Sequence, residues 1–106
     1  LVITQGERTI LQPVKDIVWI EAEGKYMNFH VGDRKFTMRC TMLQLEEQLD
    51  PEVFLRISRG AMINVDQIRE VQPWFNGEYV AVMTNGAQVT TTKSYRGALT
   101  RVLGKD

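Results

Sequence analysis

The chain has 106 residues, of which 43% are hydrophobic and 25% are charged, a size and balance typical of one soluble globular domain with a single core. No run of about 18 apolar residues occurs, so the sequence predicts no membrane-spanning segment. The formal net charge is zero, with 13 basic and 13 acidic residues, so the total charge does not favour nucleic-acid binding.

The first residue and the cysteine content indicate whether the chain is part of a longer protein and in which compartment it resides. It begins with Leu1, and no charged-then-apolar leader follows, so we interpret residues 1–106 as a single domain from within a longer protein. The single cysteine, Cys40, cannot form an internal disulfide, which is typical of the reducing cytoplasm. It also excludes a zinc site built from several cysteines. We therefore expect a cytoplasmic protein without a metal site.

The charges are unevenly distributed along the chain although their total is zero. Three stretches contain basic residues and no acid, namely 34–45, 54–65 and 86–105. Acidic residues gather instead at 21–23 and 46–52. Such segregation can place a basic face opposite an acidic face, and an ordinary mixed surface is the alternative.

Strands dominate the first half of the sequence. Residues 17–22 are almost continuously apolar and predict a buried strand. Residues 26–31 and 35–40 alternate between apolar and polar side chains, which predicts a strand with one buried face in each case. A turn at 32–33 connects the two. A short helix should follow, because Thr41 can cap it.

That first helix has further support from its spacing. Gln44 stands where it would complete a capping box with Thr41. Met42, Leu45 and Leu49 recur at helical intervals and should share one buried face.

The second half predicts a three-stranded antiparallel meander over residues 68–72, 78–84 and 88–91. Asn-Gly pairs stand between these strands at 76–77 and 85–86. Each pair suits a two-residue type I′ turn, because both central residues of that turn take positive φ.

A second helix is expected from Ser94 to about Leu103, with Leu99, Val102 and Leu103 pointing inward. Gly97 weakens this prediction by about 1 kcal/mol relative to alanine. The sequence therefore predicts a mostly β fold with two short helices.

No catalytic site is apparent. His30 is the single histidine and lies on the polar side of a predicted strand, where we interpret it as an exposed residue without a partner. Cys40 lies on an apolar strand face, which favours core filling over reactivity. No glycine-rich phosphate loop and no H-E-x-x-H pattern occurs. We therefore expect no enzyme activity and no cofactor.

The middle of the chain, F-L-R-I-S-R-G-A-M-I-N at 54–64, has an unusual alternation of apolar and basic residues. It resembles the LytTR family of bacterial DNA-binding output domains, whose pattern here is F-x-R-x-H-R-S followed by I-V-N. The matching residues are Phe54, Arg56, Arg59, Ile63, Asn64 and Ile68. Further likenesses occur in order at 20–26, 39–42, 85–86 and 89–95, so the resemblance covers roughly residues 10 to 103.

The resemblance implies an elongated sandwich of short antiparallel sheets with two short helices. It implies that loops, not a recognition helix, enter successive major grooves of double-stranded promoter DNA. It further implies the output domain of a bacterial response regulator in a two-component system, with an upstream receiver or sensor domain and a dimer on repeated half-sites.

The chain departs from the family pattern at four positions, one of which is Thr92 in place of the usual Ser. Ser58 replaces the usual His, and Gly60 replaces the usual Ser. Lys93 replaces Arg, and lysine cannot present the rigid guanidinium fork to guanine.

We expect Arg59 to contact bases, because arginine is the commonest reader of guanine and no acid stands near it in sequence. A second candidate loop combines several donors at a helix N-terminus, which favours anions. Its candidates are Lys93, Ser94 and Arg96, with Tyr95 equally suited to the core. The further DNA-binding candidates are Lys25, Tyr26, Arg39, Arg56 and Ser58.

Some residues have alternative interpretations. An ion pair with Glu52 or Asp50 is the alternative for Arg56. Asn64 favours a turn, because asparagine side chains commonly bond nearby backbone. Trp74 and Phe75 are expected to be partly buried against the meander, whereas exposure would indicate a partner surface.

Two other functions remain possible on this sequence. A protein-interaction module of the same fold is favoured by the zero net charge and by the departures at Ser58 and Lys93. Single-stranded RNA binding requires several adjacent exposed aromatics. Only Trp74 and Phe75 stand together, so this function is disfavoured.

Overall fold

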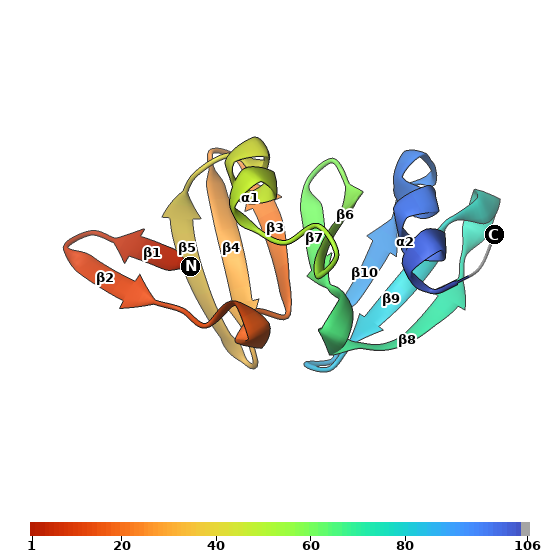
Figure 1. Cartoon of the computed structure of the whole chain (residues 1–106), viewed down its shortest axis with the longest axis horizontal. Coiled ribbons are helices and arrows are strands. Elements are labelled where there is room, and N and C mark those ends of the chain that lie inside the picture. The colour runs from red at the N-terminus through yellow and green to blue at the C-terminus, as the bar shows by residue number, and fades with distance from the viewer. Residues whose placement is uncertain (105–106) are drawn as a thin grey trace.

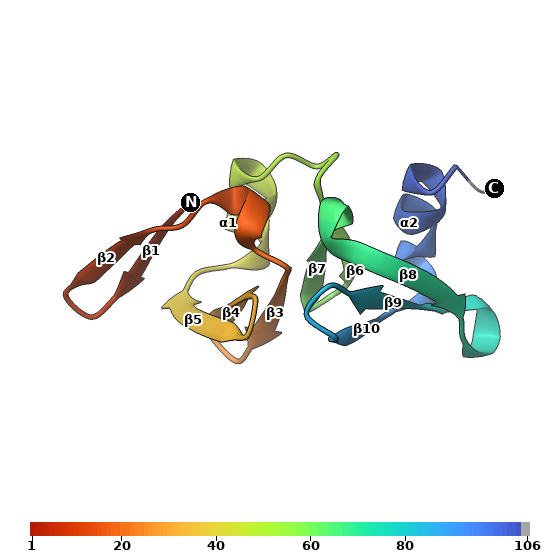
Figure 2. The same cartoon turned by 90° about the horizontal axis from the view of Figure 1, so that it is seen from below.

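The computed structural model describes residues 1–104 as an elongated body with extents of 45 × 23 × 21 Å. Three antiparallel sheets follow one another along its long axis (Figure 1). Two short helices, α1 (Met42–Gln48) and α2 (Arg96–Val102), lie on the same side of the sheets (Figure 2). The predicted mostly-β architecture is confirmed.

A two-stranded hairpin and a five-stranded sheet form the N-terminal two thirds. The hairpin consists of β1 (Val2–Gln5) and β2 (Arg8–Leu11), projects from the end of the body, and is followed by the 3-10 turn η1 (Val14–Asp16). The five-stranded sheet has the order β5-β4-β3-β7-β6. Its strands are β3 (Trp19–Glu23), β4 (Tyr26–Val31), β5 (Arg34–Arg39), β6 (Phe54–Ser58) and β7 (Ala61–Asn64).

The predicted capping box is present at the start of α1. The Thr41 hydroxyl accepts a hydrogen bond from the Gln44 amide over 3.1 Å, and the Thr41 amide donates to the Gln44 side chain over 2.9 Å. Met42, Leu45 and Leu49 are buried as the spacing predicts. These reciprocal bonds satisfy amides at the helix start that have no partner within the helix.

The C-terminal third is the predicted meander, with the order β10-β9-β8. Its elements are the 3-10 turn η2 (Val65–Gln67), β8 (Ile68–Pro73), the turn η3 (Phe75–Gly77), β9 (Tyr79–Met83), β10 (Gln88–Thr91) and the turn η4 (Lys93–Tyr95) that leads into α2. At its first hairpin Asn76 and Gly77 have φ values of 55° and 78°, and the Glu78 amide donates to the Phe75 carbonyl over 2.9 Å. The type I′ geometry is therefore confirmed, but the paired strands end at Pro73 and Tyr79, so the hairpin connection is longer than the two residues predicted.

The second hairpin differs from the prediction. Only Gly86 has positive φ there, and its amide donates to the Met83 carbonyl over 2.9 Å. This pattern is a type I turn followed by a glycine bulge, so the two-residue type I′ prediction is wrong. Asn85 keeps a negative φ, and its side chain donates to the Gly32 carbonyl and accepts from the Ala87 amide, contacts that fit this geometry.

The second helix is shorter than predicted. The segment from Lys93 to Tyr95 is a 3-10 turn, and α2 begins only at Arg96. Leu99 is fully buried and Val102 is half-buried, but Leu103 is 39% exposed. The inward orientation expected for Leu103 is wrong because the helix ends at that residue.

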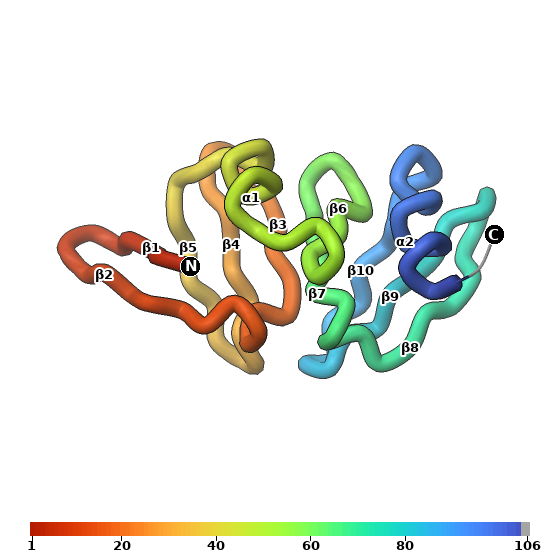
Figure 3. Tube along the Cα trace, viewed as in Figure 1, coloured from red at the N-terminus to blue at the C-terminus, as the bar shows by residue number. Residues whose placement is uncertain are grey.

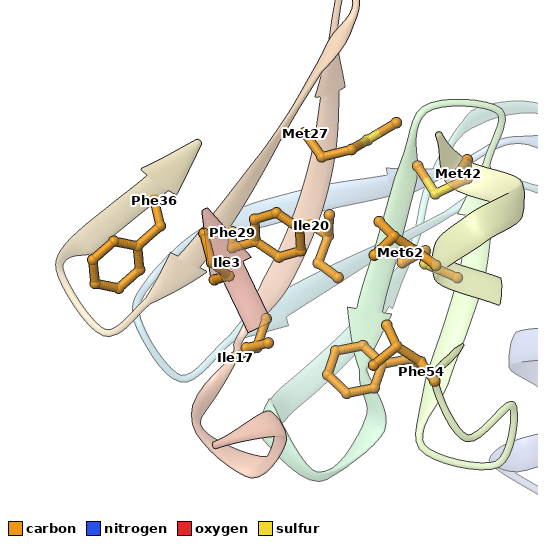
Figure 4. Packing of buried hydrophobic residues seen from close by; sticks show 11 residues of the cluster. Ile3, Ile17, Ile20, Met27, Phe29, Phe36, Met42, Phe54 and Met62 are labelled. Carbon is orange, nitrogen blue, oxygen red and sulfur yellow. The ribbon is translucent and has the colours of Figure 1, made fainter. Parts of the chain in front are cut away.

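Two hydrophobic clusters replace the single core expected from chain length. The first cluster gathers side chains around Phe29, with Met42 from α1 packed against it (Figure 4). The second lies between the β6–β7 hairpin, the meander and α2, around Ile57 and Leu99. Along β7, Met62 belongs to the first cluster and the next residue, Ile63, to the second. The β6–β7 hairpin is therefore buried on both faces and joins the two halves of the molecule.

Candidate nucleic-acid interface

Four chain segments meet along one long edge of the molecule, the upper side in Figures 1 and 3. They are residues 23–26, 39–41, 58–60 and 92–96, and together we call them the loop edge. Strand register aligns the first two segments, since Tyr26 pairs with Arg39. Two backbone hydrogen bonds extend the edge, from the Ala22 amide to the Gly60 carbonyl over 2.8 Å and from the Thr92 amide to the Ile57 carbonyl over 2.9 Å.

The residues predicted from sequence to bind DNA lie on or directly beside this edge. Most of them are exposed, namely Lys25, Tyr26, Arg39, Arg59, Lys93, Ser94 and Arg96. Ser58 and Arg56 are half-buried. Within residues 1–104, the cationic side chains of Lys25, Arg39, Arg59 and Lys93 form no ion pair. Their positive charge therefore remains directed at solvent and available to an anion.

The β6–β7 turn presents Arg59 at the centre of the edge. The strand register is irregular between Arg56 and Ser58, where the ladder is interrupted. A Cβ atom on Gly60 would lie 3.5 Å from the Cβ of Ala22, an ordinary van der Waals contact. The serine that the family pattern has at this position would therefore fit here.

Arg56 lies behind this turn, with its guanidinium group bonded within the protein. Its Nη1 donates to the Glu46 carboxylate over 3.0 Å, in one of the two ion pairs of residues 1–104. The sequence alternatives Glu52 and Asp50 are therefore the wrong partners. The Asp50 carboxylate instead accepts from the Glu52 amide over 2.9 Å.

Tyr95 lies on the other side of the same guanidinium. Its ring centroid is 5.7 Å from Cζ of Arg56, within the range of a cation–π contact. Tyr95 is half-buried, which fits a role within the protein more than at its surface. Sequence reasoning did not identify Glu46 as the partner of Arg56, because no local pattern indicates an ion pair between residues ten positions apart on different elements.

The tip of the β8–β9 hairpin lies next to the loop edge. Arg96 Nη1 donates to the Gly77 carbonyl over 3.3 Å and connects the two. Trp74 and Phe75 at this tip are 52% and 69% exposed and contact each other edge to face. The expected partial burial of these aromatics is wrong, because they lie in the turn beyond the end of β8.

His30 and Asn64 have structural partners. His30 was expected to be exposed and unpartnered, which is wrong: its Nε2 lies 2.8 Å from the Glu21 carboxylate, and its ring stacks on Trp19 at 4.4 Å. Asn64 is fully buried, donates to the Ile17 carbonyl and accepts from the Asp66 amide. The turn-forming role of Asn64 is confirmed.

Cys40 belongs to the 39–41 segment of the loop edge and is half-buried. Burial raises the pKa of its thiol, because desolvation disfavours the thiolate. Across residues 1–104, no three histidine, cysteine or acidic side chains cluster in a way that could hold a metal ion. No helix in the same range is long and apolar enough to cross a membrane.

The fold and the edge together define a class: a β-domain whose turns and strand ends, rather than a helix, present cations that have no ion-pair partner in residues 1–104. Comparison with known proteins assigns the family. Residues 7–104 match the family model of the LytTr DNA-binding domain, and the chain belongs to the LytTR family. This is a family of DNA-binding domains of transcription regulators and not a catalytic one, as the resemblance of the sequence implied.

Individual relatives agree with this assignment. The chain is 29% identical to the sensory transduction protein LytT of Bacillus subtilis, over 97% of the chain and 43% of that protein. It is 32% identical to the LytT protein of Enterococcus faecalis, over 86% of the chain and 38% of that protein. It is 31% identical to the transcriptional regulatory protein LytR of Staphylococcus aureus, over 76% of the chain and 33% of that protein. The chain thus spans less than half the length of these relatives.

A solved structure has the same fold. The LytTr DNA-binding domain of a Bacillus cereus response regulator superposes with a TM-score of 0.88 at 22% sequence identity. The match covers 98% of this chain and 95% of that one. The elongated arrangement of short antiparallel sheets with two helices is therefore shared.

Proposed function

We propose that this domain binds double-stranded promoter DNA in a sequence-specific manner through the loop edge. The observation that carries the proposal is the position of Arg59 and Lys93. Both are exposed cations without an ion-pair partner in residues 1–104. The bond between Thr92 and Ile57 brings their two segments together although they are far apart in sequence.

In this proposal the β6–β7 turn and the η4–α2 segment enter the major groove. Arg59 donates to a guanine edge, and Lys93 donates to a base or a phosphate as a point charge. The other residues of the edge bind phosphates and position the domain. They are Lys25, Tyr26, Arg39, Ser58, Ser94 and Arg96. No catalytic step is involved.

We further propose that the chain is the C-terminal output part of a longer cytoplasmic response regulator. A receiver or sensor domain upstream would control its dimerisation, and two copies would bind repeated half-sites. Linking two modest binding events multiplies the overall affinity. The lengths of the LytT and LytR relatives, which exceed this chain more than twofold, support this proposal.

Selection of duplex DNA from a random-sequence pool tests the function. We expect a short motif to be enriched, and the logarithm of the affinity for it should fall linearly with the logarithm of salt concentration as counterions are released. Arg59→Glu should abolish this binding. Arg69→Glu is the matched control, because Arg69 is also exposed but lies on β8, outside the loop edge. The absence of any enriched motif at low salt would reject the proposal.

The second candidate is a protein-interaction module of this fold, favoured by the exposed Trp74–Phe75 pair. Large exposed aromatics are enriched at protein interfaces. Under this alternative, Arg59→Glu leaves partner binding intact, whereas replacement of both aromatics by serine removes it. The two functions thus respond to different substitutions.

A further inference from the structure

We propose that Arg56 is a positioning residue, which holds the β6–β7 turn in its DNA-binding shape and does not itself contact DNA. The inference rests on the proposed function, because it concerns how the loop edge presents Arg59. It differs from the interpretation that the sequence alone suggests, in which Arg56 is another phosphate ligand.

The hydrogen bonds of the Arg56 side chain carry the proposal. Nε donates to the Ser58 carbonyl over 3.3 Å, and Nη2 donates to the Arg59 carbonyl over 2.6 Å. Nη1 donates to Glu46, so each of the three guanidinium nitrogens has an acceptor within the protein. Only 23% of the side chain is exposed. Three of the five N–H donors are thus used within the protein, and the low exposure of the side chain disfavours a phosphate contact by the other two.

The β6–β7 turn depends on these bonds because the regular backbone pairing of β6 with β7 is interrupted beside it. The register of β6 against β7 shifts between Arg56 and Ser58. Arg56 thus supplies two hydrogen bonds to consecutive carbonyls at the point where regular strand pairing is interrupted. A turn fixed before binding loses less conformational entropy when it enters the groove.

Arg56 also connects three elements that are distant in sequence. Glu46 belongs to α1, and Tyr95, whose ring lies beside the guanidinium, belongs to η4. The Glu46–Arg56–Tyr95 group therefore sets the position of the β6–β7 turn relative to the segment that carries Lys93.

Removing the Glu46 side chain tests the proposal, because a pure charge effect and a positioning effect predict opposite changes in DNA affinity. An acid close to a DNA-binding edge repels the phosphates, so its removal should strengthen binding if only charge matters. If Glu46 anchors Arg56, its removal should weaken binding. Glu47 is the matched control, because it is the next residue of α1, is also exposed, and forms no ion pair within residues 1–104.

The experiment compares Glu46→Ala with Glu47→Ala by fluorescence anisotropy on the duplex that the wild-type domain enriches from the random pool. We expect Glu47→Ala to leave affinity unchanged or slightly higher. Glu46→Ala should lower affinity about tenfold, the scale of one lost charge-assisted hydrogen bond. Equal behaviour of the two variants would overturn the proposal.

The salt dependence of Arg56 variants gives an independent readout. Loss of a phosphate contact reduces the slope of log affinity against log salt by about 0.9, whereas loss of positioning leaves the slope unchanged. Arg56→Lys should bind as weakly as Arg56→Gln, since one ammonium nitrogen cannot replace three guanidinium nitrogens. A reduced slope, or rescue by lysine, would overturn the proposal. A wild-type domain that enriches no duplex would instead reject the proposed function itself.

Discussion

The amide of Thr92 donates a hydrogen bond to the carbonyl of Ile57 over 2.9 Å. This bond joins the end of β10 to the outer strand of the five-stranded sheet. It places Lys93, the next residue after Thr92, beside the turn that carries Arg59. The relative position of the two principal DNA-contact candidates therefore depends on packing between two separate sheets, and several substitutions test its consequences.

Replacing Arg59 by lysine should weaken discrimination between DNA sequences more than it weakens binding itself. Lysine keeps the positive charge but loses the bidentate geometry for guanine, which contributes about 1–3 kcal/mol of discrimination. Selection from a random duplex pool measures this as a degenerate base at one position of the motif. An unchanged motif would show that Arg59 contacts only phosphate.

Replacing Lys93 by arginine should strengthen sequence-specific binding. Arginine is the residue of the LytTR pattern at this position, and its planar fork can donate twice to one guanine. We expect affinity for a guanine-containing site to rise about tenfold by anisotropy. Lys35→Arg is the control, since Lys35 is exposed on β5 opposite His30, away from the loop edge. An equal gain in both variants would indicate a non-specific effect.

The two hydrophobic clusters should unfold together. Met62→Ala and Ile63→Ala each create a cavity in a different cluster, and each should lower the free energy of unfolding by about 2–5 kcal/mol. Because both residues lie on β7, urea denaturation should still show one transition. Leu43→Ala is the control, because Leu43 is 64% exposed and should change stability by less than about 0.5 kcal/mol. Two separate transitions would contradict the interpretation that the β6–β7 hairpin joins the two clusters into one cooperative unit.

The aromatic tip should contribute little to stability. Trp74→Ser combined with Phe75→Ser removes two exposed side chains, so the free energy of unfolding should change by less than about 1 kcal/mol. DNA affinity should also remain unchanged. Urea denaturation and anisotropy measure the two quantities. A strong loss of stability would mean that these rings are packed in solution.

The thiol of Cys40 should react slowly in the folded protein. Its raised pKa means that less thiolate is present at any given pH near neutrality, and the thiolate is the reactive form. Alkylation by iodoacetamide at mildly alkaline pH should therefore be slower than for the same chain unfolded in urea. Faster alkylation of the folded chain would contradict the burial of this thiol.

The elements that sequence reasoning predicted correctly depend on residues close together in the chain. Thr41 and Gln44 form the capping box within one helical turn. Asn76 and Gly77 adopt the positive φ values that a type I′ turn requires. The strand predicted at 26–31 has the bounds of β4, although Asn28 on its polar side is buried as well. Such local interactions have the same partners in any tertiary fold, so the sequence pattern is enough to predict them.

The family pattern also located the candidate residues of the loop edge, although local physics could not have done so. The resemblance through 54–64 and 89–95 identified Arg59 and Lys93. It could not indicate which basic side chains remain free. Only the tertiary structure shows Arg56 bonded to Glu46 and Lys25 without an ion pair in residues 1–104.

The sequence by itself thus determined the strands, the helix cap, one hairpin turn and the family. Tertiary structure decided the partner of Arg56, the stacking of His30 on Trp19, the exposure of Phe75 and the division of the core. Each of these depends on which strands lie side by side and in what register. Asn85 illustrates the reason: its side chain donates to the Gly32 carbonyl, an acceptor distant in sequence that only the packed sheets bring within 3.1 Å.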